Sequence, residues 1–207
     1  MKNNKKVPST KFSRVFQTLT AEERFAFGRY VRQQSLEANS YCTQLLEALT
    51  DSKTEKWTRS ELFAHAFPQR TYQEVFLRKQ FSALFGHLRA FLIQLEWQDD
   101  PVGQELAFLR QLKKRECKHQ FDLVARRLSQ QLAEQDLQDS QQHYYKYQLA
   151  SAQDRLFLQQ QVRRYDPALQ TASDELDAFY FSKKLELSCE MHNRSRIVEG
   201  AYESRFL

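Results

Sequence analysis

The chain has 207 residues, of which 41% are hydrophobic, 13% aromatic and 28% charged, and its formal net charge is +5. Such a chain can build one large or two small domains around packed cores, and its aromatic content excludes a wholly disordered protein. Every apolar run is short and broken by charges, which excludes a helix with the roughly 20 apolar residues needed to cross a bilayer.

The positive charge is concentrated at the amino terminus. Residues 1–14 contain five basic residues and no acidic one, whereas the rest of the chain contains 26 basic and 26 acidic residues. We expect residues 1–11 to form a disordered basic tail, because they are polar and interrupted by Pro8. No apolar segment follows the first residues, so they do not form a secretory signal. The body of the protein is neutral by count, which weakens the case for a nucleic-acid-binding surface.

The cysteines indicate the redox environment. Cys42, Cys117 and Cys189 are odd in number, far apart and outside any C-x-x-C spacing. This pattern favours buried thiols in a reducing compartment, and we therefore expect a cytoplasmic protein.

Helix-start signals dominate the sequence. Three segments have the capping-box pattern, in which a Thr hydroxyl accepts from a first-turn N–H and a Glu carboxylate accepts from the N-cap N–H. Apolar residues follow each box at helical spacing, and only 4 Gly and 4 Pro interrupt the chain. We therefore predict an all-α protein. The three boxes are Thr20–Glu23, Thr58–Glu61 and Thr71–Glu74.

Residues 12–100 are expected to form an irregular helical region. A helix that starts at Thr20 is expected to bury Phe25 on its apolar side. The longest helix is expected to start at Thr71 and to carry one apolar stripe over about five turns. Asp99-Asp100-Pro101 is expected to end that helix and to mark the internal boundary. The expected helices span residues 12–19, 20–34, 40–51, 58–67 and 71–98.

Residues 101–207 show a more regular pattern, in which short links predict antiparallel neighbours. Residues 104–141 make one hairpin close to the 34-residue length of a tetratricopeptide (TPR) unit. We predict antiparallel helical hairpins stacked as a short TPR-like solenoid, although the consensus residues of that repeat are missing. The expected helices span residues 103–116, 118–137 and 140–162, and a last helix is expected to open at Ser173-Asp174-Glu175.

The sequence predicts no catalytic, cofactor-binding or metal-binding residue. It contains no H-E-x-x-H, no G-x-S-x-G, no G-x-x-x-x-G-K-[ST] and no G-x-G-x-x-G pattern. Cys189 and His192 are three residues apart and could face one ion, but zinc would need two further ligands that the spacing does not identify. We therefore expect a protein that is not an enzyme and that carries no cofactor.

Nucleic-acid binding is the alternative function. Residues 60–90 have the proportions of a helix-turn-helix, with a turn at Pro68-Gln69-Arg70, and the basic tail could add affinity. The first turns of the second helix, however, carry Tyr72 and Val75 where a helix that reads bases would carry polar side chains.

The last helix is expected to present a partner-packing surface. Its apolar residues surround much of the helix, and one preceding hairpin can cover only part of that circumference. We therefore expect the chain to be a fragment that binds another protein or its own missing carboxyl-terminal region. The residues expected at this surface are Phe181, Leu185, Met191 and Phe206.

Three further segments carry a resemblance to a known family. They are Ser60-Glu61-Leu62-Phe63 followed by Phe67-Pro68, Tyr72 before the long Leu-rich helix, and the segment from Phe181 to Arg194. With them the chain resembles a family of uncharacterised bacterial all-helical proteins, longer than this chain, with TPR-like helical hairpins in the later part. The resemblance implies a fold and a missing carboxyl-terminal region, and it carries no activity. Together with the absent catalytic motifs, it leads us to expect a non-catalytic interaction module.

Overall fold

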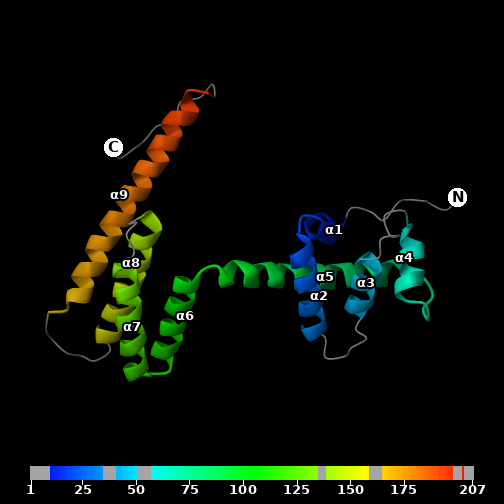
Figure 1. The fold of residues 1–207 in the computed structure, drawn as a ribbon, viewed down its shortest axis with the longest axis horizontal. Helices are drawn as coiled ribbons and strands as arrows, with labels where there is room; N and C mark the ends of the chain where they lie inside the picture. Colours follow the sequence, from blue (N-terminus) through cyan, green and yellow to red (C-terminus); the bar gives the residue numbers. More distant parts are fainter. Residues whose placement is uncertain are drawn as a thin grey trace. The chain divides into compact units, whose positions relative to one another are not determined.

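The structure, a computed structural model, describes residues 10–34, 41–50, 57–134, 139–158, 165–197 and 202. Helices make up 84% of these residues and none of them lies in a strand, which confirms the all-α prediction (Figure 1). The chain divides into two compact units, Met1–Asp99 and Asp100–Leu207. No helix in the described ranges combines the length and apolar content that a bilayer crossing requires. Residues 1–9 of the expected tail lie outside the described residues, and Lys11 belongs to the first helix.

The first unit is built around its longest helix, α5. The side chains of α5 that are buried recur every three or four residues, as one side of a helix requires. Helices α1, α2 and α3 pack against this side, and burying each of its large apolar side chains contributes roughly 1.5–3 kcal/mol. The described helices of this unit are α1 Lys11–Phe16, α2 Ala21–Gln34, α3 Tyr41–Thr50, α4 Arg59–Ala66 and α5 Glu74–Gln98.

Phenylalanines join the helices of this core. The ring of Phe12 in α1 lies 5.1 Å from Phe16, 6.2 Å from Phe27 of α2 and 6.4 Å from Phe81 of α5, measured between ring centroids. The expectation that Phe25 is buried was wrong, since its side chain is 68% exposed. Phe27 and Phe25 are two residues apart and point to different sides of α2, and only the side of Phe27 faces α5 and α1.

Two of the three predicted capping boxes are present. The N–H of Thr20 donates to Glu23 Oε2 at 2.7 Å, and the N–H of Glu23 donates back to Thr20 Oγ1 at 3.2 Å. In the box before α4, the N–H of Thr58 donates to Glu61 Oε2 at 2.7 Å. Hydrogen bonds from the backbone and the hydroxyl of Thr58 lower the pKa of the Glu61 carboxyl.

The box predicted at Thr71 was wrong. Helix α5 begins at Glu74, and its N-cap residue, Gln73, makes no side-chain cap hydrogen bond. The Glu74 carboxylate instead pairs with Arg59 and accepts a hydrogen bond from the Tyr72 hydroxyl at 2.6 Å. A charge-assisted pair to a neighbouring helix is stronger than a neutral hydrogen bond, so the carboxylate is held away from the backbone N–H of Thr71.

The second unit has a core shared by three helices. Its described helices are α6 Pro101–Lys114, α7 Lys118–Ala133, α8 Ser140–Leu158 and α9 Pro167–Ser195. The buried apolar cluster takes its residues from α6, α7 and α8. A link of three residues joins α6 to α7, and Glu116 within it has a left-handed φ of 58° that reverses the chain.

Two helices start earlier than the sequence predicted, each at a proline. Helix α5 ends at Gln98, before Pro101, as expected, but Pro101 is also the first residue of α6, two residues before the expected start at residue 103. Pro167 likewise opens α9 six residues before the expected Ser173. Proline suits the first helical position, because its missing N–H would have no partner there. The preceding Asp100 and Asp166 accept hydrogen bonds from the first turns of these helices.

Asp100 connects the start of α6 to α8. Its Oδ1 accepts from the N–H of Gly103 at 2.7 Å and from the hydroxyl of Tyr145 at 2.7 Å. Burial and then the hydrogen bond to Asp100 raise the pKa of the Tyr145 phenol. A Cβ atom on Gly103 would lie 1.9 Å from Asp100 Oδ2, so this close approach requires glycine.

Two glycine substitutions should therefore have opposite effects. A Cβ atom on Gly86, on the exposed side of α5, would meet no atom within 4 Å. Gly86→Ala should raise the free energy of unfolding by about 0.5–1 kcal/mol, because alanine is the better helix former. Gly103→Ala should lower it by up to about 1 kcal/mol, because the Cβ displaces the Asp100 carboxylate, and the loss of both its cap and its Tyr145 hydrogen bond exceeds that gain. Urea denaturation measures both, and equal effects of the same sign would contradict this description of Gly103.

The capping assignment gives a second matched pair. Thr58→Ala should cost about 1 kcal/mol of stability, whereas Thr71→Ala should be nearly neutral, because only Thr58 caps a helix. The Glu61 contribution to this cap is complete above the usual pKa of glutamate and is lost as pH falls through the lowered pKa. Thermal unfolding should thus show the difference between the two variants narrowing in strong acid without closing, because the Thr58 hydroxyl still accepts from the Glu61 N–H. A larger cost for Thr71→Ala would mean that α5 begins earlier than Glu74.

Candidate functional site

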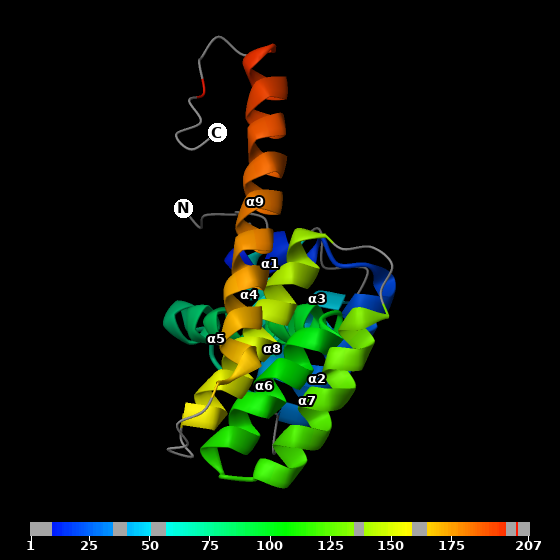
Figure 2. The same cartoon turned by 90° about the vertical axis from the view of Figure 1, so that its left-hand side faces the viewer.

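Helix α9 is the most exposed long helix of the second unit. It has 29 residues, and Ala172 is the only one of them that is buried. None of its residues belongs to the described apolar cluster that α6, α7 and α8 share. Helix α9 packs on α8, and Figure 2 shows it continuing beyond the length that α8 covers. The helix is therefore attached to the outside of a three-helix core.

Polar and aromatic pairs hold α9 to α8. Ser140, the first residue of α8, pairs with Glu186, whereas the next paired residues of α8 contact earlier residues of α9. The two helices are therefore antiparallel, as predicted for neighbours in this region. Hydrogen bonds from Lys183 and then Ser140 lower the pKa of the Glu186 carboxyl, which keeps it ionised at this contact. The pairs are His143 Nδ1 with Glu175 Oε2 at 2.7 Å, Tyr144 with Phe179 at 5.1 Å between centroids, and Ser140 Oγ with Glu186 Oε1 at 2.8 Å.

A second side of α9 carries exposed apolar side chains. We call Leu169, Leu176, Tyr180 and Leu187 the α9 strip, and their exposed fractions are 61%, 43%, 44% and 52%. Their spacing of 7, 4 and 7 residues places them in one row along the helix. At about 100° per residue, this row lies roughly a quarter turn from the side that holds Glu175 and Phe179. The strip is thus turned away from α8 along most of the helix.

The three described residues of the predicted partner-packing surface do not form one row. Phe181 and Leu185 are 59% and 54% exposed, and they share a side of α9 because they are four residues apart. Met191 is half-buried and lies four residues after Leu187, on the side of the α9 strip. Phe206 lies outside the described residues.

None of the four strip residues was among the four residues predicted for the partner-packing surface. Leu169, Leu176 and Tyr180 are spaced by 7 and 4 residues, and this helical spacing could have identified the row from the sequence. Because the helix was expected to open at Ser173, Leu169 fell outside it and the row lost its first member. The error at Pro167 therefore explains why Leu169 was missed, but not Leu176 or Tyr180, which lie inside the expected helix.

The possible metal pair has no further ligands in the described part of the chain. Cys189 and His192 are both exposed on α9. Among the described residues, no group of three or more His, Cys, Asp or Glu side chains could hold an ion. The expected burial of all three thiols was wrong for Cys189, which lies beyond the stretch that α8 covers, whereas Cys42 and Cys117 are half-buried. Burial raises the pKa of the Cys42 thiol, so it is a poor nucleophile.

Two cations in or beside the segment considered for nucleic-acid binding, Arg70 and Arg59, interact within the protein. Seven residues separate α4 from α5, more than the three or four of a helix-turn-helix. The guanidinium of Arg70 lies 4.6 Å from the ring centroid of Tyr41 and 4.8 Å from that of Phe76, and Arg59 pairs with Glu74. Val75, in the first turn of α5, is 65% exposed. This surface offers little polar contact to base edges.

Comparisons with protein-family models, with curated proteins and with solved structures find no match to this chain. The candidate site therefore rests on the geometry of α9 itself.

Substitutions on the α9 strip should not affect folding. Leu176→Gln and Leu187→Gln should each change the free energy of unfolding by less than about 0.5 kcal/mol, because both side chains are substantially exposed. The control is Leu128→Ala in α7, where a fully buried leucine should cost about 2–5 kcal/mol. Chemical denaturation measures all three. A large cost at Leu176 or Leu187 would show that the strip is covered within this chain.

Proposed function

We propose that the chain is a non-catalytic interaction module that binds an amphipathic helix on the α9 strip. The partner helix belongs to another protein or to a further segment of the same chain. The observation that carries the proposal is a 29-residue helix with one buried residue and four large apolar side chains exposed in a single row. A row with this spacing is what a second helix covers when it lies lengthwise on the first.

The energetics favour a helix as the partner. Full burial of a large apolar side chain is worth roughly 1.5–3 kcal/mol, and the four strip residues begin partly buried. Part of the gain offsets the loss of translational and rotational freedom on association, so a partner must cover several strip residues at once. From Leu169 to Leu187 the strip rises by 18 residue steps, or about 27 Å, a length that a helix of five turns matches.

Three finer expectations belong to the same proposal. We propose that α6–α9 stack as TPR-like antiparallel hairpins, which is supported by the three-residue link between α6 and α7 and by the antiparallel pairing of α8 with α9. We propose that the chain belongs to the bacterial all-helical family, because the three sequence segments described above resemble that family. Free thiols at Cys42, Cys117 and Cys189 support a cytoplasmic location.

Site-specific photo-crosslinking tests the interaction. A photoreactive phenylalanine analogue at Leu176 or Leu187 should crosslink to one protein segment whose labelled residues recur every three or four positions. The variant that combines Leu176→Gln with Leu187→Gln should lose at least tenfold in affinity for that segment, because two apolar contacts are removed.

Leu123→Gln provides the matched control, since Leu123 is 52% exposed on α7, away from the strip. This variant should bind the partner as the unmodified chain does. Equal losses for the control and the strip variant would contradict the proposal. Capture of nucleic acid alone, weakening steeply with salt, would favour the nucleic-acid alternative instead.

A further inference from the structure

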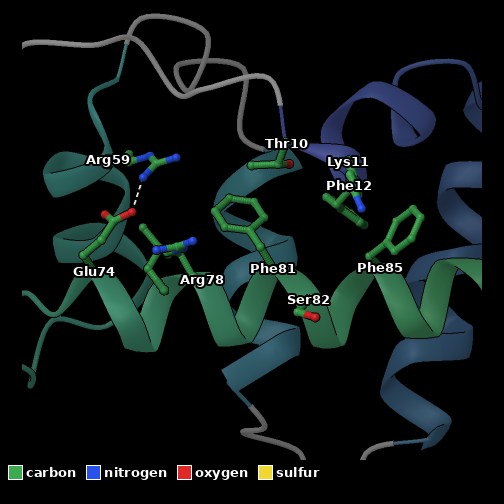
Figure 3. A pocket seen from close by; sticks show the side chains of 10 residues that line it. Thr10, Lys11, Phe12, Arg59, Glu74, Arg78, Phe81, Ser82 and Phe85 are labelled. Carbon is green, nitrogen blue, oxygen red and sulfur yellow. Dashed lines mark hydrogen bonds and ion pairs between the residues drawn. The ribbon is translucent and has the colours of Figure 1, made fainter.

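A cavity in the first unit has a lining suited to a ligand. It has a volume of about 460 Å³ and lies between α1 and α5, beside the start of α4. This volume is within the range of small-molecule sites in proteins. Its apolar lining includes Phe12, Phe81 and Phe85, which come from two different helices (Figure 3). Phe12 and Phe81 are held in place by the unit's core, where they are 1% and 8% exposed.

The same cavity carries an excess of positive charge. Three cations line it, Lys11, Arg59 and Arg78, against one carboxylate, Glu74. Glu74 is already paired with Arg59 and accepts from the Tyr72 hydroxyl, so it does not neutralise the other two cations. Within the described residues, neither Lys11 nor Arg78 forms an ion pair.

The cations and the rings occupy positions that one molecule can span. Figure 3 shows Arg59 and Arg78 on one side of Phe81, and Lys11 with Phe12 and Phe85 on the other. An arginine can bind a carboxylate through two parallel hydrogen bonds, and a lysine adds a point charge. A second apolar hollow along α5 also includes Phe85, so the apolar surface continues toward Trp97.

We propose that this cavity binds a small organic anion that carries a carboxylate on an apolar body. Arg78 binds the carboxylate, Lys11 adds positive potential from the other side of Phe81, and the phenylalanine rings contact the apolar body. The site lies in the first unit and shares no residue with the α9 strip, so it is independent of the proposed partner binding. Charge attraction is strengthened beside the apolar lining, because the rings exclude water from one side of the ion pair.

Isothermal titration calorimetry with octanoate and with 1-naphthoate tests the proposal on the full chain. Both carboxylates should bind. Hexanoate should bind up to about fifteenfold more weakly than octanoate, because it lacks two methylenes and each buried methylene contributes about fourfold in affinity at most. Octanol, which lacks the charge, should bind at least tenfold more weakly, and added salt should weaken only the carboxylates. The proposal is overturned if neither carboxylate binds, or if octanol binds as well as octanoate.

Two matched pairs of variants locate the site. Arg78→Gln should weaken octanoate binding roughly five- to tenfold, whereas Lys79→Gln, the next residue on α5 and not part of the cavity lining, should leave it unchanged. Ser82→Phe should block the cavity that Ser82 lines, and Ala83→Phe should not. All four positions are exposed, so circular dichroism should show the fold retained. Equal effects within either pair would indicate general charge or surface adsorption and would overturn the site.

Discussion

Helix α9 is longer than the helix that supports it, and the candidate interaction surface follows from this difference. At about 1.5 Å per residue, the 29 residues of α9 extend about 44 Å, whereas the 19 residues of α8 extend about 29 Å. A helix buries only the side and the length that its neighbours cover. The contact with α8 is made by charged, hydroxyl and aromatic groups, so the leucines of α9 are left for another surface.

The same constraint shapes the first unit around α5. One side of that helix is buried under α1, α2 and α3, and this side accounts for the phenylalanine core. The short helix α1 covers only part of α5, and the ligand cavity lies beside it. Cations can line this cavity because Lys11 and Arg78 are exposed to solvent, and long basic side chains can lie along apolar rings while their charged ends stay in water. A helix that is incompletely covered is thus the source of both candidate sites.

Local signals explain how far the fold could be predicted from the sequence. The boxes at Thr20 and Thr58 were predictable, because their partners are three residues away and no other group competes for them. The box at Thr71 failed, because Arg59, fifteen residues from Glu74, engages the carboxylate that the box required. The prolines at the starts of α6 and α9 follow an equally local rule, in which Asp caps the helix and Pro occupies its first position.

The sequence by itself determined the helical state and the apolar periodicity of almost every described segment, because both depend on groups within four residues of each other. Only the tertiary structure decided which apolar residues are covered. Phe27 is fully buried while Phe25 is exposed, and Leu109 is buried while Leu176 is not, although each pair is chemically alike. Coverage depends on which distant helices meet and for what length. The exposed row on α9 and the charged cavity beside α5 could be recognised only once those neighbours were in place.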